Sequence, residues 1–231
     1  WYNAPDTWIK AENWNDAGHY IPDSELEGLD AYLGMDLAQS QDFTAIALII
    51  PYKDVLVLKV WCFIPEETVI ERVSAGLSTL EDWIEKGYVI ATEGNATDYT
   101  VVEDKIIELA STYKVNGLFY DPYNATQLVT RLAESGITDV FGVTQTPTHL
   151  GEASKEFEMK ILKKQINHLK NPVLGWMANN VVIRSYPSGV FMVNKNKSFD
   201  KIDGISASVM ALKCYMDKHV FVKNIPLVES W

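Results

Sequence analysis

Three aspartates stand where strands or helices are predicted to begin or end. Asp36 lies within the apolar run AYLGMDL, Asp121 closes GLFYD, and Asp203 follows Ile202 at the first turn of a predicted helix. A carboxylate among apolar residues is costly to bury unless a cation or hydrogen-bond donors compensate it. Carboxylate oxygens suit Mg²⁺ or Mn²⁺, and two such ions ~3.5–4 Å apart promote phosphodiester hydrolysis. The three residues therefore indicate metal-dependent hydrolysis, provided that the fold brings them together.

Each aspartate also has a purely structural interpretation. Asp36 could be a polar residue at a strand end, and Asp121 could start a turn before Pro122. Asp203 could cap the last helix, a role for which Asp200 competes. Taken singly, none of the three is specific.

The elements that must position them form an alternating pattern. Apolar, β-rich runs predict an antiparallel meander whose strands are buried on both faces; they cover residues 31–37, 43–52 and 55–64. Helical periodicity predicts helices over 71–87, 101–113, 124–136, 155–169 and 202–218. Shorter runs predict strands over 88–92, 117–121 and 140–145 and a hairpin of 181–186 with 190–195. This order predicts an α/β fold, a mixed sheet with helices on both faces.

Composition divides the chain into three parts. Residues 1–28 are rich in Trp, Asn, Asp and Pro without a clear period, which is typical of a linker or strap. Residues 29–220 are expected to form the folded domain, with 221–231 as a C-terminal tail. The first residues show no signal-peptide pattern. The chain starts with Trp1 rather than Met, so a fragment of a longer polypeptide is expected. Cys62 and Cys214 are expected to be buried and unpaired.

The charge is unevenly distributed. The net charge is −11, which by itself argues against a nucleic-acid partner. Residues 153–201, however, contain nine Lys and Arg against three acidic residues. This segment could face phosphates, or it could be a solvated helix face. No apolar run approaches the ~20 residues of a membrane span.

Three segments together resemble one protein family. GMDLAQSQDFTAIAL, FYDPYNATQLVTRLAESG and KIDGISASVMAL resemble, in this order, the nuclease domain of the large terminase subunit of tailed bacteriophages. The likeness covers roughly residues 1–217. It implies a ribonuclease H-like mixed sheet of βββαβαβα order with a β-hairpin insertion. It also implies a two-metal endonuclease that cuts concatemeric double-stranded DNA during genome packaging, with Asp36, Asp121 and Asp203 as catalytic, metal-binding residues.

The same resemblance implies partners and a setting. An ATPase motor would precede residues 1–28 in the same polypeptide, and the portal and the small terminase subunit would be further partners, with no membrane. The sequence contains no G-x-x-x-x-G-K-[ST] loop, so no ATP site is expected here. Two Mg²⁺ or Mn²⁺ ions would be the cofactors, and the host cytoplasm would be the location.

Further candidates are less specific. Asp42 and Asp200 could add carboxylates to the site, although a turn position for Asp42 and an exposed position for Asp200 are the favoured interpretations. Three lysines could contact DNA phosphates or could be ordinary surface residues: Lys155, Lys195 and Lys197. His149 and His168 are expected to be structural or exposed, and Trp61, Trp83 and Trp176 to belong to the core.

Two other classes of protein remain open at this point. The actin-like phosphotransferases share a βββαβα core and a first hairpin similar to GMDLAQSQDFT, but they require a second lobe with its own phosphate loop. A catalytically silent docking module of the packaging motor is the other alternative. ATP binding would favour the first, and absence of metal near Asp36 would favour the second.

Overall fold

The computed structural model describes residues 8–37, 42–122, 125–187 and 189–217. Its centre is a seven-stranded sheet in the order β4-β3-β2-β1-β5-β6, with the short β7 paired to β3. The strands are β1 (Asp30–Asp36), β2 (Thr44–Tyr52), β3 (Val55–Pro65), β4 (Val89–Thr92), β5 (Lys114–Tyr120), β6 (Val140–Gly142) and β7 (Ile166–Asn167). β8 (Ile183–Ser185) and β9 (Phe191–Val193) form a separate antiparallel hairpin.

The first three strands form the predicted antiparallel meander. β1 pairs with β2 and β2 with β3 in antiparallel register, whereas β5 is parallel to β1 and β6 is parallel to β5. The sheet is therefore mixed, as predicted. The near-continuous apolar character of β2 follows from its central place, because every residue from Thr44 to Ile50 is buried.

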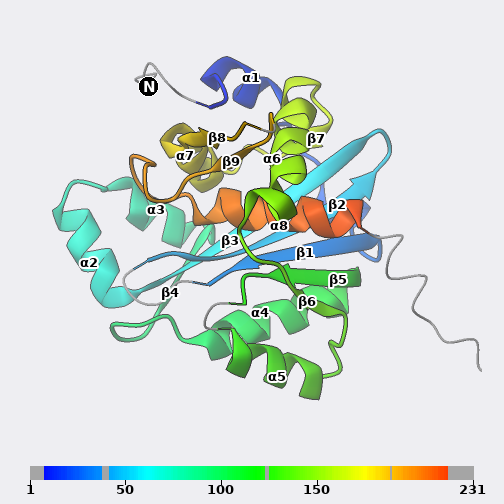
Figure 1. The fold of residues 1–231 in the computed structure, drawn as a ribbon. Coiled ribbons are helices and arrows are strands. Elements are labelled where there is room, and N and C mark those ends of the chain that lie inside the picture. Colours follow the sequence, from blue (N-terminus) through cyan, green and yellow to red (C-terminus); the bar gives the residue numbers. More distant parts are fainter. Residues whose placement is uncertain (1–7, 38–41, 123–124, 188, 218–231) are drawn as a thin grey trace, which may run out of the picture.

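Helices cover both faces of the sheet (Figure 1). On one face lie α1 (Ala11–Asp16), α6 (Pro147–Leu162), α7 (Pro172–Asn180) and α8 (Asp203–Met216). On the other face lie α4 (Tyr99–Thr112) and α5 (Thr126–Glu134). Successive side chains of β2 point to opposite faces of the sheet. Ala45 and Ala47 belong to the core on the α8 side, and Ile46 and Leu48 belong to the core on the α4 side.

Helix α8 lies directly on β1 and β2. A methyl group built on Gly34 in β1 would lie 2.2 Å from the Ala207 carbonyl oxygen and 2.3 Å from the Ala211 nitrogen. Only glycine permits this approach of helix backbone to strand backbone. The distance between β1 and α8 is thus determined at Gly34, two residues before Asp36.

Several predicted helix boundaries were wrong. The helix predicted over 71–87 is two helices, α2 (Glu66–Ser74) and α3 (Thr79–Glu85), because Gly76 adopts a φ of +107° between them. The helix predicted over 155–169 begins earlier, at Pro147, a favourable first-turn position for proline. It ends at Leu162, and 166–167 form β7 instead. Helix α7 was not predicted.

The segment predicted to be an irregular strap is partly structured and well packed. It contains α1 and a short 3₁₀ turn at Asp23–Glu25, and Trp8 and Trp14 are buried. Trp1 and the predicted tail 221–231 lie outside the described residues. The predictions for Cys62 and Cys214 are confirmed, since both are buried and unpaired. In the part of the chain that the structure describes, no helix is long and apolar enough to cross a bilayer.

Candidate functional site

Two of the three aspartates meet because β1 and β5 are neighbours. Asp36 is the last residue of β1, and Asp121 directly follows the last residue of β5. The two strands run parallel, with Met35 opposite Tyr120. Their carboxyl ends therefore lie at the same edge of the sheet, which is where open α/β sheets place their ligands.

Asp203 reaches the same edge from α8. It is the first residue of that helix and is buried, whereas Ile202 occupies the cap position without a side-chain cap. The capping interpretation of Asp203 and Asp200 was therefore wrong. A methyl group on Gly204 would meet the Met177 sulfur at 2.9 Å, so the glycine lets the helix start close to α7.

Two side chains connect the three carboxylates. The Lys195 ammonium lies 2.9 Å from Asp203 Oδ1 and forms a shorter ion pair with Asp36 Oδ2. The Gln145 amide nitrogen donates to Asp36 Oδ1 at 3.2 Å and to Asp121 Oδ2 at 2.9 Å. The structure thus brings the three predicted aspartates together, with Asp36 in the middle of the group.

Burial and the nearest opposite charge shift the pKa values of Asp36 and Lys195 in opposite directions. Burial raises the pKa of Asp36 to about 6, although the Lys195 ammonium lowers it and the Asp203 carboxylate raises it again. Burial alone lowers the pKa of Lys195, but the carboxylates of Asp36 and Asp203 outweigh it, so this pKa lies above its ordinary value. Lys195 is therefore an ammonium, and its charge makes the burial of Asp36 tolerable.

The carboxylate oxygens of this group are suitable ligands for a hard divalent cation, but in this structure the Lys195 ammonium lies among them. The Asp203 Oδ2 atom is buried and has no hydrogen-bond partner in the described structure. Such an atom is costly to bury unless something compensates it, and carboxylate oxygens are the ligands that Mg²⁺ and Mn²⁺ prefer. As they lie in this structure, the described His, Cys, Asp and Glu side chains form no group of three positioned to hold a metal ion.

The two additional acidic candidates do not join this group. Asp42 forms an ion pair with Lys201, and Asp200 lies 3.2 Å from the Arg72 guanidinium. The Asp200 carboxylate also accepts a hydrogen bond from the Lys201 backbone nitrogen. Both acids therefore connect the loop before α8 to neighbouring segments.

The predicted DNA-contacting lysines lie in different settings. Lys195 is part of the carboxylate group, whereas Lys197 is exposed in the turn after β9 and Lys155 is exposed on α6. Gly151, one turn before Lys155, packs against Val190 beside the hairpin, so this part of α6 faces β9.

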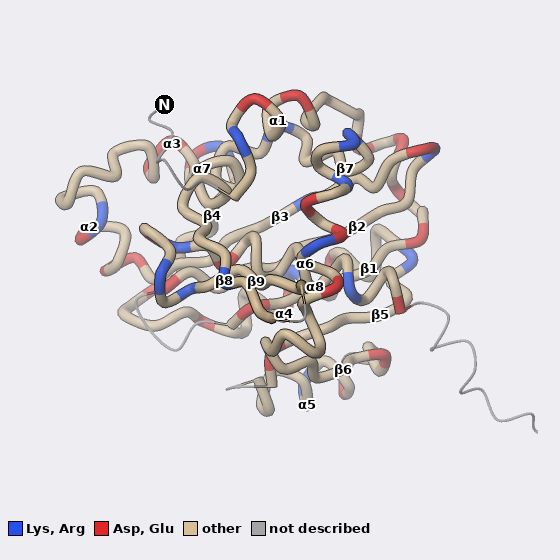
Figure 2. Tube along the Cα trace, turned by 45° about the horizontal axis from the view of Figure 1, so that its top comes forward, with Lys and Arg blue, Asp and Glu red and all other residues tan. Residues whose placement is uncertain are grey.

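The Lys and Arg residues of the basic segment 153–201 are spread over α6, β8 and the loops after α6, β7 and β9. Figure 2 shows Lys and Arg positions on several elements of the chain. Lys164 pairs with Asp16 of α1, and Lys170 lines a pocket beside α1. Near the carboxylates, by contrast, Arg184 and Lys195 line a hollow of about 180 Å³ together with Gln145, Tyr186, Met192, Val193, Asn194 and Asn196. We call this hollow the hairpin pocket.

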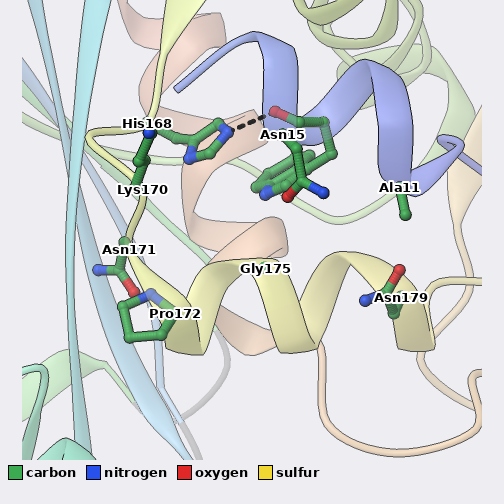
Figure 3. A pocket seen from close by; sticks show the side chains of 9 residues that line it. Ala11, Asn15, His168, Lys170, Asn171, Pro172, Gly175 and Asn179 are labelled. Carbon is green, nitrogen blue, oxygen red and sulfur yellow. Dashed lines mark hydrogen bonds between the residues drawn. The ribbon is translucent and has the colours of Figure 1, made fainter. Parts of the chain in front are cut away.

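A second pocket, of about 320 Å³, lies between α1 and α7 (Figure 3). His168 lines it and is buried, stacked on Trp14 at 4.4 Å and hydrogen-bonded to the Trp14 carbonyl oxygen. Burial lowers the pKa of His168, so the imidazole is neutral near pH 7. The structural role predicted for His168 is confirmed. His149 bonds Thr144 and Thr146 near the start of α6.

The sequence did not identify Gln145 as a site residue, and it suggested DNA phosphates rather than carboxylates as the partners of Lys195. Gln145 closes the strand predicted over 140–145, although β6 itself ends at Gly142. A polar residue just after a parallel strand lies at the ligand-binding edge, and this signal could have identified it. The contact of Lys195 with Asp36 joins residues far apart in sequence, and no sequence signal could have revealed it.

Comparison with known proteins connects this geometry to one family. Residues 1–218 match the family model described as "Terminase large subunit, endonuclease domain". Protein YmfN of Escherichia coli (strain K12) is 25% identical over a match of 229 positions, and the match covers 92% of this chain and 49% of YmfN. The chain thus spans about half the length of that relative.

Solved structures show the same fold. The large terminase of bacteriophage HK97 superposes with a TM-score of 0.82 at 23% identity, over 90% of this chain and 43% of that protein. The large terminase nuclease of the thermophilic phage G20c gives a TM-score of 0.53 at 11% identity, over 84% of each chain. The same G20c nuclease with bound magnesium gives 0.52 at 10% identity, again over 84% of each chain. The predicted ribonuclease H-like, mixed α/β architecture is confirmed.

Proposed function

Because the chain belongs to the family of terminase large-subunit endonuclease domains, we propose that it is a metal-dependent endonuclease that cuts double-stranded DNA. One observation carries this proposal more than any other. Asp36, Asp121 and Asp203 meet at one edge of the sheet and share Lys195 and Gln145 as partners. The bound magnesium in the G20c nuclease supports the choice of cofactor.

In the proposed mechanism the carboxylate oxygens of the three aspartates would hold two divalent ions. When bound, such ions supply the charge that activates an attacking water and stabilises the departing oxygen of a phosphodiester. Asp36 is central because it ends β1 between the other two carboxylates. Gln145 keeps the Asp36 and Asp121 carboxylates oriented toward each other, and the packing of α8 at Gly34 maintains the position of Asp203.

The wider setting follows from the family and is likewise proposed. The substrate would be concatemeric DNA that is cut during genome packaging in the host cytoplasm. The chain spans 43% of the HK97 large terminase. The family resemblance implies an ATPase motor in the same polypeptide, before residues 1–28. Residues 29–220 would be the nuclease domain and 221–231 a tail. The portal and the small terminase subunit would be further partners.

The test is cleavage of supercoiled plasmid by the purified chain with Mg²⁺ or Mn²⁺. Asp36→Asn removes the central charge and keeps the shape of the side chain, so nicking should fall at least 100-fold. Asp104→Asn is the matched control, since Asp104 is an exposed residue of α4 on the opposite face of the sheet. Chelation of the metal should stop cleavage by the parent chain.

Two outcomes would contradict the proposal. Cleavage by the Asp36→Asn variant at the parent rate would exclude this site as the catalytic centre. A parent chain that folds and binds DNA but does not cut with either metal would favour the alternative function, a docking module of the packaging motor.

A further inference from the structure

Lys195 has an unusual position for a basic residue of a DNA-cutting protein. Its ammonium contacts the carboxylates of Asp36 and Asp203, although 37% of its side chain is exposed. Asp36 is 2% exposed, so the ammonium is its main compensating charge. Lys195 therefore takes the place in which a cation would contact the oxygens of these two aspartates.

The formal charges of the site sum to zero in two combinations of side chains, metal ions and DNA. Three carboxylates and one ammonium leave two negative charges, which a single divalent ion neutralises. If Lys195 withdraws, the three carboxylates and one phosphodiester carry four negative charges, which two divalent ions neutralise. With Lys195 in place and two ions bound, an excess positive charge would be buried, which is strongly unfavourable.

The hairpin pocket offers a reason for Lys195 to leave. Its lining combines Arg184, which pairs with no carboxylate in the described part of the chain, with the amides of Asn194 and Asn196. Guanidinium and amide groups are donors that bind phosphate oxygens. Lys195 itself lines this pocket, so its flexible side chain can turn from the carboxylates to a phosphate without a change in the backbone.

We propose that Lys195 is a tethered cation that holds the place of the second metal ion until a DNA phosphate enters the hairpin pocket. The phosphate would attract the ammonium away from Asp36 and Asp203 and so open the site for full metal loading. This inference rests on the proposed nuclease function and concerns its regulation: metal loading and DNA binding promote each other. Coupling of this kind is reciprocal, so DNA must raise the affinity for metal.

The experiment measures metal binding rather than activity. Mn²⁺ is titrated into the chain, and free Mn²⁺ is followed by electron paramagnetic resonance, with and without a short DNA duplex of slowly cleaved phosphorothioate linkages. Without DNA, Lys195→Met should bind Mn²⁺ at least tenfold more tightly than the parent chain. The duplex should tighten Mn²⁺ binding by the parent several-fold and by Lys195→Met less than twofold.

Lys163→Met is the matched control, because Lys163 is exposed at the C-terminal end of α6, whereas Gln145 precedes the N-terminal end of that helix; it should behave as the parent does. Removal of Lys195 leaves carboxylates uncompensated, so Lys195→Gln, which keeps a hydrogen-bond donor without the charge, provides a second variant. Without DNA, Lys195→Gln should also bind Mn²⁺ at least tenfold more tightly than the parent chain. Urea midpoints with and without Mn²⁺ give an independent measurement, since Mn²⁺ should stabilise both variants more than the parent.

The outcomes separate this inference from the proposed function. If Asp36→Asn loses Mn²⁺ while Lys195→Met and Lys195→Gln bind it as the parent does, the tethered-cation inference is overturned and the metal site stands. If DNA tightens Mn²⁺ binding equally in the parent and in Lys195→Met, the link to the phosphate is overturned. If Asp36→Asn binds Mn²⁺ as tightly as the parent, the metal site fails and the inference fails with it.

Discussion

Substitution of Gly34 by alanine tests whether the contact between β1 and α8 determines the geometry of the site. The added methyl group would lie 2.2 Å from the Ala207 carbonyl oxygen and 2.3 Å from the Ala211 nitrogen, whereas ordinary contacts begin at 3.4 Å. The obstructing atoms belong to the helix backbone, so no side-chain rotation relieves the overlap. Helix α8 would have to move away from the sheet by about 1 Å.

The cost follows from the place of α8 in the core. All but three of its residues are buried, so a shift of the helix disturbs packing along its whole length. Overpacking typically costs about 1–3 kcal/mol, and reduced freedom of the unfolded chain returns about 0.4–1 kcal/mol. We therefore expect Gly34→Ala to lower the free energy of unfolding by about 1–2 kcal/mol. We also expect it to reduce cleavage, since Asp36 and Asp203 lie on the two separated elements.

Equilibrium unfolding in urea measures this loss, with Gly175→Ala as the matched control. Gly175 lies inside α7, and a methyl group there would meet only the Trp14 indole, at 3.4 Å from Nε1 and 4.0 Å from Cδ1. Alanine is the better helix former by about 0.8–1 kcal/mol, so this variant should be as stable as the parent or slightly more stable. A Gly34→Ala midpoint within error of the Gly175→Ala midpoint would refute the reasoning.

Three further predictions concern single side chains. Gln145→Ala removes both amide hydrogen bonds to the carboxylates and should lower cleavage about 10- to 100-fold, the usual effect of losing a group that orients metal ligands; unchanged rates would contradict its orienting role. Asp200→Asn should change the free energy of unfolding by less than about 1 kcal/mol and cleavage by less than about twofold, because the pair with Arg72 is partly exposed; a loss as large as that of Asp36→Asn would make Asp200 a metal ligand. Burial lowers the pKa of His168 below the value of about 6.5 in the unfolded chain, so the unfolded state binds more protons and stability should fall as the pH drops through 6.5 toward the folded-state pKa. Urea midpoints at pH 7.5 and 5.5 should show this loss in the parent and a smaller loss in His168→Gln, and equal losses would exclude His168 as its source.

The sequence was sufficient to predict the fold class and the identity of the three aspartates. Continuous apolar runs in β2 and β3 indicated a sheet that is buried on both faces, because a central strand needs apolar side chains on each side. The positions of Asp36 and Asp121 at strand ends could be predicted, since local pattern determines where a strand stops. Their metal-binding and catalytic roles remain predictions.

Element boundaries were less predictable, because tertiary contacts compete with local preference. The period of hydrophobic residues over 71–87 continues through Gly76, although its positive φ ends α2 and starts a turn before α3. The segment before residue 29 lacks any period, but Trp8 and Trp14 bury themselves against α6 and His168. Burial against a distant element leaves no periodic signal in the segment itself.

The sequence by itself determined which chemistry is possible: three carboxylates at element ends, and an ordered set of segments typical of one family. Only the tertiary structure decided what surrounds them. The parallel pairing of β1 with β5 joins Asp36 to Asp121, and the packing of α8 at Gly34 brings Asp203 to the same edge. It also decided that Lys195 lies among the carboxylates, because that contact depends on how the segment after β9 and the end of β1 meet in space, and the spacing of residues along the chain does not encode it.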